Sequence, residues 1–326
     1  MTQQSAFDYL SHGQIPFFRL PMSPVAGGVP QGTGAVILGV PYDGGTTYRP
    51  GARLAPFEVR RVSALVQGYH PLHRLAVFDR IRVVDGGNVA FPPFDAAAVR
   101  GRVEGAVAAV VESGAVPFLV GGDHSVALPA LRAVAHRHGA LAVVHVDAHL
   151  DTSGPEVWGE RYHHGTPLRH ALEEGLIAQG QLHQIGIRGP WGDAREAELG
   201  AMHGARVHTA EDVADRGVAS IAAEIRHEVR GRPVYLSFDV DAVDPAFAPG
   251  TGTPVPGGLT SREALQLVRE LAGIRLVGMD VVEVCPPLDH ADVTSHLAAH
   301  VLFEGVALPA LTVPAAVGDA DAPAAT

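Results

Sequence analysis

The feature that most constrains the fold is an alternation of short apolar runs with longer helix-like segments. The runs have strand lengths and lie at 35–40, 81–84, 116–120, 141–146, 184–187, 234–238 and 274–282. Helix-like segments separate several of them, at 96–112, 128–138, 221–229 and 262–271. Strands that alternate with crossover helices predict an α/β protein with a mainly parallel sheet covered on both faces.

Composition indicates a globular chain with one large domain. Apolar residues make up 47% of the 326 residues, and charged residues make up 18%. Residues 1–30 are irregular and rich in proline, which predicts an N-terminal arm. Residues 31–313 are expected to form a single catalytic domain. Residues 314–326 are of low complexity and are predicted to be a disordered tail.

Charge and cysteine content exclude several classes of function. The formal net charge is −11, so neither nucleic acid nor an anionic membrane surface is an expected partner. Cys285 is the only cysteine, which excludes an intrachain disulfide and a thiolate metal cluster. We see no signal-like N-terminus and no membrane-length apolar run, so a cytoplasmic protein is expected.

Polar residues follow four of the predicted strands. Active sites of parallel sheets lie beyond the carboxyl ends of the strands, so these residues are the candidates for chemistry. The spacing by two within the clusters predicts side chains on one side of an extended chain. The candidates are His124; Asp147, His149 and Asp151; Asp239 and Asp241; and Glu283.

The six candidates before Glu283 comprise two imidazoles and four carboxylates, which predicts a metal centre. Buried anions in this number are very unfavourable without compensating cations. Oxygen and imidazole ligands without thiolate favour Mn²⁺, with Co²⁺, Ni²⁺ or Zn²⁺ also possible. Six ligands are too many for one catalytic ion with open positions, so we expect two divalent ions.

Other polar residues have simpler explanations. A lone Asp after a strand is usually a turn residue or a helix N-cap, and we assign Asp123 and Asp244 to that class. Asp79 and Asp85 are also expected to be structural. Five histidines have no chemical context, namely His136, His138, His183, His203 and His208. One of the pair His163 and His164 is expected to be functional. Two glycine-rich stretches lie at 32–34 and 250–252. Neither has the strand–glycine–helix context of a dinucleotide-binding loop.

At this point the motifs resemble those of the ureohydrolase family of arginase, agmatinase and related amidinohydrolases. The similar segments are GGDHS (121–125), DAHLD (147–151), HHGTP (163–167), SFDVDAVDPAFAPGTGTP (237–254) and VVEVCPP (281–287). Segment 39–60, GVPYDGGTTYRPGARLAPFEVR, resembles the agmatinase-like branch. Together with HHGTPLRH it is especially similar to proclavaminate amidinohydrolase and the guanidino-acid hydrolases. The resemblance covers residues 37 to about 306.

This resemblance implies a three-layer α/β/α arginase-type fold, assembled as a homotrimer or homohexamer. It also implies roles for the candidate residues. Asp147 and Asp239 would bridge the two ions. His124 and Asp151 would complete the first site, and His149 and Asp241 the second. Of the catalytic residues, Asp151 would accept a proton from the attacking water, His164 would shuttle a proton to the leaving amine, and Glu283 would hold the guanidinium.

The expected function is therefore a binuclear metal hydrolase that cleaves a small guanidino compound to urea and an amine. Agmatine or a guanidino acid such as 4-guanidinobutyrate is the expected substrate, and a larger biosynthetic guanidino intermediate is the alternative. Segments 152–163 and 188–193 are expected to contact the substrate tail, through Trp158, Arg161, His163 and residues such as Arg188. Two other classes of function compete with this expectation, namely a one-metal deacetylase and a non-catalytic binding protein.

Overall fold

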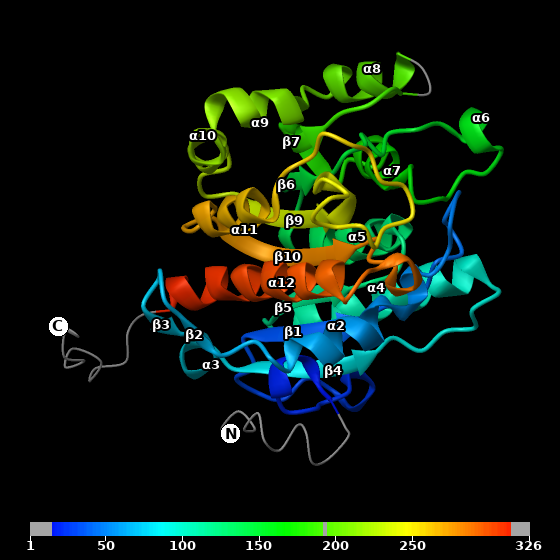
Figure 1. Cartoon of the computed structure of the whole chain (residues 1–326). Coiled ribbons are helices and arrows are strands. Elements are labelled where there is room, and N and C mark those ends of the chain that lie inside the picture. The colour runs from blue at the N-terminus through cyan, green and yellow to red at the C-terminus, as the bar shows by residue number, and fades with distance from the viewer. Residues whose placement is uncertain (1–14, 192–193, 314–326) are drawn as a thin grey trace.

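The computed structural model describes residues 15–191 and 194–313. Within them, eight strands form one sheet in the order β4-β1-β5-β10-β9-β6-β7-β8, and every neighbouring pair is parallel (Figure 1). The strands are β1 (Ala35–Gly39), β4 (Val83–Asn88), β5 (Val116–Val120), β6 (Leu141–Val146), β7 (Ile177–Ile187), β8 (Arg206–Thr209), β9 (Pro233–Asp239) and β10 (Arg275–Val282). A separate antiparallel hairpin contains β2 (Tyr69–His70) and β3 (Leu75–Ala76).

Helices cover both faces of the sheet, which gives the predicted three-layer α/β/α architecture. One face packs on α2 (Ala55–Ser63), α10 (Val218–Glu228), α11 (Ser261–Glu270) and α12 (Val293–Thr312). The other face packs on α4 (Ala96–Glu112), α5 (Ala127–His138), α7 (Pro167–Glu173) and α8 (Arg195–Met202). The short helices α3 (Val77–Arg80), α6 (Pro155–Trp158) and α9 (Ala210–Arg216) complete the set. Strand residues alternate between the two apolar cores, as expected for a sheet buried on both sides.

Several element bounds differ from the sequence predictions for physical reasons. Strand β7 begins at Ile177 and not at 184, because Ile177 already pairs with Leu141 of β6, before an irregularity in the pairing that ends at Leu182. Strand β4 extends to Asn88 through Asp85 and two glycines, residue types that disfavour strands. The edge strand β8 and the long helix α12 were not predicted. Helix α12 is apolar on all sides, so it has no helical hydrophobic stripe that a sequence pattern could reveal.

The described part of the N-terminal arm packs against the domain. Phe17 and Phe18 are fully buried, and the backbone N–H of Phe17 donates to the Asp85 carboxylate. Asp85 also accepts two hydrogen bonds from the Arg60 guanidinium, at 2.8 and 3.1 Å. The predicted structural role of Asp85 is therefore supported, although it lies inside β4 and not at a turn. The boundaries of the arm and domain stay predictions, and the predicted tail lies outside the described residues.

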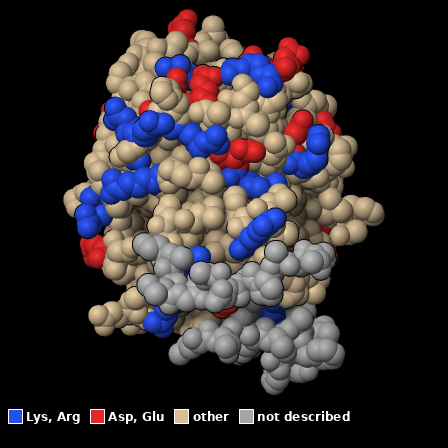
Figure 2. All heavy atoms as spheres, turned by 90° about the vertical axis from the view of Figure 1, so that its left-hand side faces the viewer, with Lys and Arg blue, Asp and Glu red and all other residues tan. Residues whose placement is uncertain are grey.

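The molecular face at the beginning of the strands carries arginines interspersed with acids (Figure 2). Ion pairs such as Arg206–Glu228 and Arg132–Glu174 combine the two signs on the surface. The buried carboxylates of the predicted metal centre belong to the opposite, carboxyl edge of the sheet. Among the described residues, no helix is both long enough and apolar enough to cross a membrane.

Candidate metal centre and active site

Four strands that are consecutive in the sheet, β5-β10-β9-β6, supply the predicted site residues. His124 follows β5, Glu283 follows β10, Asp239 ends β9, and Asp147 follows β6. Because these strands are parallel, their carboxyl ends meet at one edge of the sheet. The predicted convergence of the three metal-ligand clusters is therefore a direct result of the strand order.

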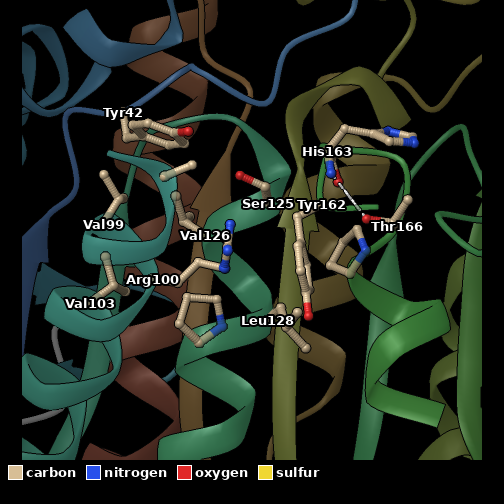
Figure 3. Close-up of a pocket in the computed structure, with 13 residues that line it drawn as sticks. Tyr42, Val99, Arg100, Val103, Ser125, Val126, Leu128, Tyr162, His163 and Thr166 are labelled. Carbon is tan, nitrogen blue, oxygen red and sulfur yellow. Dashed lines mark hydrogen bonds between the residues drawn. The ribbon is translucent and has the colours of Figure 1, made fainter. Parts of the chain in front are cut away.

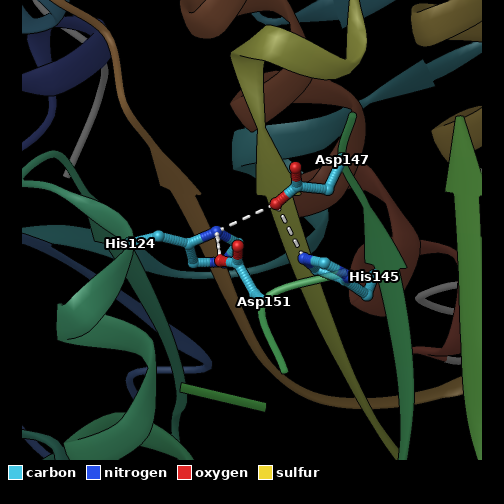
Figure 4. Close-up of side chains that lie close together, drawn as sticks. All are labelled: His124, His145, Asp147 and Asp151. Carbon is cyan, nitrogen blue, oxygen red and sulfur yellow. Dashed lines mark hydrogen bonds and ion pairs between the residues drawn. The ribbon is translucent and has the colours of Figure 1, made fainter. Parts of the chain in front are cut away.

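A first group of side chains surrounds the Nδ1 atom of His124. Carboxylate oxygens of Asp151, Asp147 and Asp239 lie 2.9, 3.1 and 3.3 Å from this nitrogen. Figure 4 shows how His124, Asp147 and Asp151 point toward one another. All four residues are buried, and Nδ1 has no hydrogen-bond partner of acceptable geometry among the described residues.

The other side of the His124 ring explains why Nδ1 is suited to a metal. Its Nε2 lies 2.8 Å from the Ser237 hydroxyl. Ser237 donates its one hydrogen to Asp280, which also accepts from the Tyr235 hydroxyl. The Ser237 oxygen therefore accepts the hydrogen of His124 Nε2, and in a neutral ring Nδ1 holds a lone pair. A cation among the three carboxylates would bind this lone pair. Without one, burial lowers the pKa of His124, but Asp151, Asp147 and Asp239 outweigh burial and raise it well above its ordinary value.

A second group shares Asp147 with the first. Asp147 Oδ1 and Asp241 Oδ2 lie 3.3 and 3.0 Å from His149 Nδ1. The two oxygens of Asp147 therefore face different histidines, His149 on one side and His124 on the other. Asp239 and Asp241 are also connected, since Asp239 Oδ1 accepts the backbone N–H of Asp241.

The pKa values indicate how the protein balances this charge when no cation is present. Burial raises the pKa of Asp239 well above its usual range, and nearby Asp241 and Asp147 raise it further. Burial alone would lower the pKa of His149, but Asp241 and Asp147 outweigh it and raise that pKa to about 12. Protons thus compensate the carboxylates where a divalent cation would do so more directly.

The local backbone differs from the extended chain that the spacing by two predicted. Strand β6 ends at Val146, and Asp151 has a left-handed backbone with φ of 52°. Asp241 lies in the short 3-10 helix η5 (Val240–Ala242). The side chains converge because the chain bends after each strand, so the predicted convergence is right and its predicted cause is wrong.

His164 and Glu283 form a second functional unit next to the metal-ligand groups. His164 Nδ1 lies 2.9 Å from Glu283 Oε1, which also accepts the backbone N–H of His124 at 2.9 Å. On the other side of the ring, Nε2 lies 2.7 Å from the Thr47 hydroxyl. Burial lowers the pKa of His164, but Glu283 outweighs this effect and raises it to about 9. Glu283 itself has a left-handed backbone, with φ of 63°.

A cavity opens directly above these groups and contains most of the predicted residues. It is lined by Thr47, His124, His149, Asp151, Ser153, Trp158, His163, His164, Gly165, Glu196, Asp239, Asp241 and Thr253. Asp147 and Glu283 do not line it but contact residues that do. Trp158, which is 61% exposed, stands at its surface.

Two arginines that were expected near the substrate tail lie elsewhere. Arg161 is exposed, and its guanidinium lies over the Tyr162 ring, 5.4 Å from the centroid, outside the cavity lining. Arg188 is buried and donates to backbone carbonyls, including Asp241 at 2.7 Å and Ala242 at 3.0 Å. This supports a structural role for Arg188, since it secures the loop that carries Asp241.

Asp123 and Asp244 have the predicted turn roles. Asp123 caps the short helix η4 (His124–Val126) by accepting the N–H of Ser125, and it also accepts the N–H of Gly45. Asp244 accepts from Ala246 and from the Gly257 and Gly258 backbone. Gly45 in turn accepts the backbone N–H of His164, so Asp123 indirectly supports the candidate catalytic histidine.

A neighbouring pocket between α4, α5 and the 162–167 segment lies behind His163 (Figure 3). The Arg100 guanidinium there stacks on the Tyr162 ring at 4.1 Å. The His163 ring is turned away from the other lining side chains, and its backbone carbonyl accepts from the Thr166 hydroxyl. The lining of this pocket contains no acidic side chain, so it does not have the composition of a metal site. Its residues instead pack around the loop that carries His163.

Some residues that contact the site were missed in the sequence. They are Thr47, His145, Gln184, Ser237 and Asp280. The signal for three of them was a polar residue inside an apolar strand run, His145 in LAVVHV, Ser237 in VYLSF and Asp280 in RLVGMDVV. No local pattern pointed to Thr47, because only the tertiary fold brings its loop to His164.

Fold and site together define an α/β protein with a candidate metal centre at the carboxyl edge of its sheet. The chain belongs to the arginase family, whose model matches residues 33–307. It is 47% identical to proclavaminate amidinohydrolase of Streptomyces clavuligerus, over 89% of this chain and 91% of that protein. The solved structure of that enzyme has a TM-score of 0.86, with 91% of this chain and 97% of that chain covered.

Two other relatives are informative. Guanidinopropionase of Pseudomonas aeruginosa is 46% identical, over 82% of this chain and 84% of that protein. A structure of Trypanosoma cruzi formiminoglutamase with Mn²⁺ is 25% identical and has a TM-score of 0.79, covering 86% of this chain and 95% of that one. The predicted family and its arginase-type fold are confirmed.

Proposed function

We propose that this protein is a binuclear metal hydrolase that cleaves a linear guanidino compound to urea and an amine. The observation that carries the proposal is the shared carboxylate of Asp147. Its two oxygens face two separate imidazoles, His124 and His149, each with further buried carboxylates nearby. Two adjacent sites with a common ligand are the geometry of a two-metal hydrolase.

The donor set fits two divalent ions. His124, Asp151, Asp147 and Asp239 would hold the first, and His149, Asp241, Asp147 and Asp239 the second. Imidazole and carboxylate ligands without thiolate favour Mn²⁺, and the Mn²⁺-containing Trypanosoma relative supports this choice. Such ions, when bound, supply Lewis-acid activation of water and charge stabilisation for attack at a guanidinium carbon.

The protein side chains supply orientation and proton transfer. Glu283 would pair with the guanidinium and place its carbon beside the two sites. Asp151, at the cavity wall, is placed to accept a proton from the attacking water. His164 would give a proton to the leaving amine, because a pKa of about 9 keeps it charged at neutral pH. Carbon–nitrogen cleavage, with the second proton of the attacking water also passing to the amine, then yields urea and a protonated amine.

The substrate tail would extend toward Ser153, Trp158, His163 and Glu196 at the outer part of the cavity. Agmatine or a guanidino acid such as 4-guanidinobutyrate is the proposed substrate. The likeness to guanidinopropionase supports a guanidino acid. The likeness to proclavaminate amidinohydrolase favours the second candidate, a larger biosynthetic guanidino intermediate. Arg161 remains a proposed carboxylate contact only if its exposed side chain turns toward the cavity.

Urea release across a substrate panel tests the proposal. Protein loaded with Mn²⁺ is assayed with agmatine, arginine, 4-guanidinobutyrate, 3-guanidinopropionate and free guanidine, and its metal content is measured by elemental analysis. We expect about two ions per chain, urea from at least one linear compound, and loss of activity with a chelator.

Two outcomes would contradict it. One bound ion per chain with amide hydrolysis would favour the one-metal deacetylase alternative. Two ions without urea from any compound, including the substrate of the Streptomyces enzyme, would favour a non-catalytic binding protein. A homotrimer or homohexamer and a cytoplasmic location stay predictions, to be checked by light scattering and by fractionation.

A further inference from the structure

His145 is a buried polar residue that the proposed mechanism leaves without a role. It lies on β6, two residues before Asp147, and its side chain is fully buried. Its Nε2 lies 2.8 Å from Asp147 Oδ2, the oxygen that also faces His124 (Figure 4). His145 could therefore be either a metal ligand itself or a residue that orients a ligand.

Gln184 decides between these two roles. It lies directly opposite His145 on the neighbouring strand β7. Its amide nitrogen lies 2.8 Å from the Leu150 carbonyl and 3.1 Å from His145 Nδ1. A carbonyl only accepts hydrogen bonds, so the atom facing Leu150 must be the amide nitrogen and not the amide oxygen. Its second hydrogen then points to His145 Nδ1.

The tautomer of His145 follows from this contact. Nδ1 accepts a hydrogen bond, so in the neutral ring the hydrogen is on Nε2 and is donated to Asp147 Oδ2. Both ring nitrogens are thereby engaged, which leaves no lone pair for a metal ion. The other oxygen of Asp147 accepts the backbone N–H of His149 at 2.6 Å. Asp147 is thus held by one donor at each oxygen.

We propose that Gln184 and His145 are positioning residues that orient Asp147 so that each of its oxygens faces one metal site. Gln184 also holds the backbone of Leu150, which leads into Asp151, and so couples the two carboxylates of the DAHLD segment. Partners of metal ligands of this kind typically contribute 10–100-fold to metal affinity or activity. The inference rests on the proposed binuclear centre.

The test measures Mn²⁺ affinity and stoichiometry by calorimetry on folded, metal-stripped protein. His145→Leu removes the donor, whereas His145→Gln keeps an N–H group near the position of Nε2. Gln184→Glu replaces the amide donor with an acceptor, which favours a hydrogen on Nδ1 and turns a lone pair toward Asp147. His183→Leu is the control, because His183 is an equally buried histidine on β7 whose Nδ1 lies 3.6 Å from a Glu228 carboxylate oxygen, away from the site.

We expect His145→Leu and Gln184→Glu to weaken Mn²⁺ binding by about 10–100-fold with two ions still bound at saturation. His145→Gln should restore most of the affinity, and His183→Leu should leave it unchanged. Circular dichroism checks that each variant is folded.

Several results would overturn the inference. Wild-type affinity in both His145→Leu and Gln184→Glu would show that the contacts do not orient Asp147. Loss of one whole ion in His145→Leu, not restored by His145→Gln, would make His145 a ligand. If the wild-type chain bound fewer than two ions, the proposed binuclear centre would be wrong. The inference, which rests on that centre, would then be overturned as well.

Discussion

His164 is the residue whose protonation depends most clearly on one neighbour. Glu283 raises its pKa to about 9, from an ordinary value near 6.5. A raised folded-state pKa stabilises the folded protein below the unfolded pKa, and this stability is lost as the pH rises through the folded pKa. The loss for His164 therefore falls between about pH 6.5 and pH 9. His163, next to it, has its pKa lowered by burial, so its effect has the opposite sign.

This difference predicts the pH dependence of stability in metal-stripped protein. His164→Gln should lower the free energy of unfolding by about 2–3 kcal/mol more at pH 6 than at pH 9.5, because one pKa unit corresponds to about 1.4 kcal/mol. Urea unfolding of wild type and variant at both pH values measures it. In the His163→Gln control, the cost should be larger at the high pH. An equal cost of His164→Gln at both pH values would show that Glu283 does not hold a proton on His164.

At the scale of elements, the loops after β9 and β10 determine where two site carboxylates lie. Glu283 enters its loop with a left-handed backbone, and Asp241 sits in η5. The η5 loop is fixed by Arg188, whose guanidinium reaches the carbonyls of Asp241, Ala242 and Val255. An arginine directly after β7 thus replaces the regular hydrogen bonds that this irregular backbone lacks.

Arg188→Met is expected to leave several buried carbonyls without a donor. Each unsatisfied buried group costs about 1–3 kcal/mol, so we expect a total loss of about 3–6 kcal/mol in chemical unfolding. Mn²⁺ affinity should fall too, because Asp241 loses its support. Arg161→Met is the matched control, since its exposed side chain should contribute within about 0.5 kcal/mol. Equal stability of the two variants would contradict a structural role for Arg188.

At the scale of the whole molecule, folding gathers four buried carboxylates that repel one another. A cation that binds only the folded chain stabilises it by mass action, by about 2.7 kcal/mol per site at 100 times Kd. We therefore expect Mn²⁺ to raise the Tm by roughly 5 °C or more relative to chelator, by differential scanning calorimetry. Asp239→Asn, which removes a carboxylate that we propose both ions share, should show a smaller rise. The same Tm with Mn²⁺ and with chelator would argue against any resident metal.

The sequence by itself determined the α/β class, the candidate metal-binding residues and the edge of the sheet at which they meet. These follow from local information, since apolar runs define strands and polar residues directly after them fall at the carboxyl edge. The family motifs added the proposed roles of His164 and Glu283. Such patterns did not reveal helix α12, because it is buried on all sides and has no polar face. They did not reveal the edge strand β8 either, because its pairing with β7 defines it.

Only the tertiary structure decided which atoms face one another. The bend at Asp151, the contact of Thr47 with His164 and the loop support by Arg188 join segments far apart in the chain. The tautomers of His124 and His145 likewise depend on Ser237 and Gln184, which come from neighbouring strands. A hydrogen bond is set by distance and direction in space, and sequence spacing does not contain these quantities once the chain leaves a regular strand.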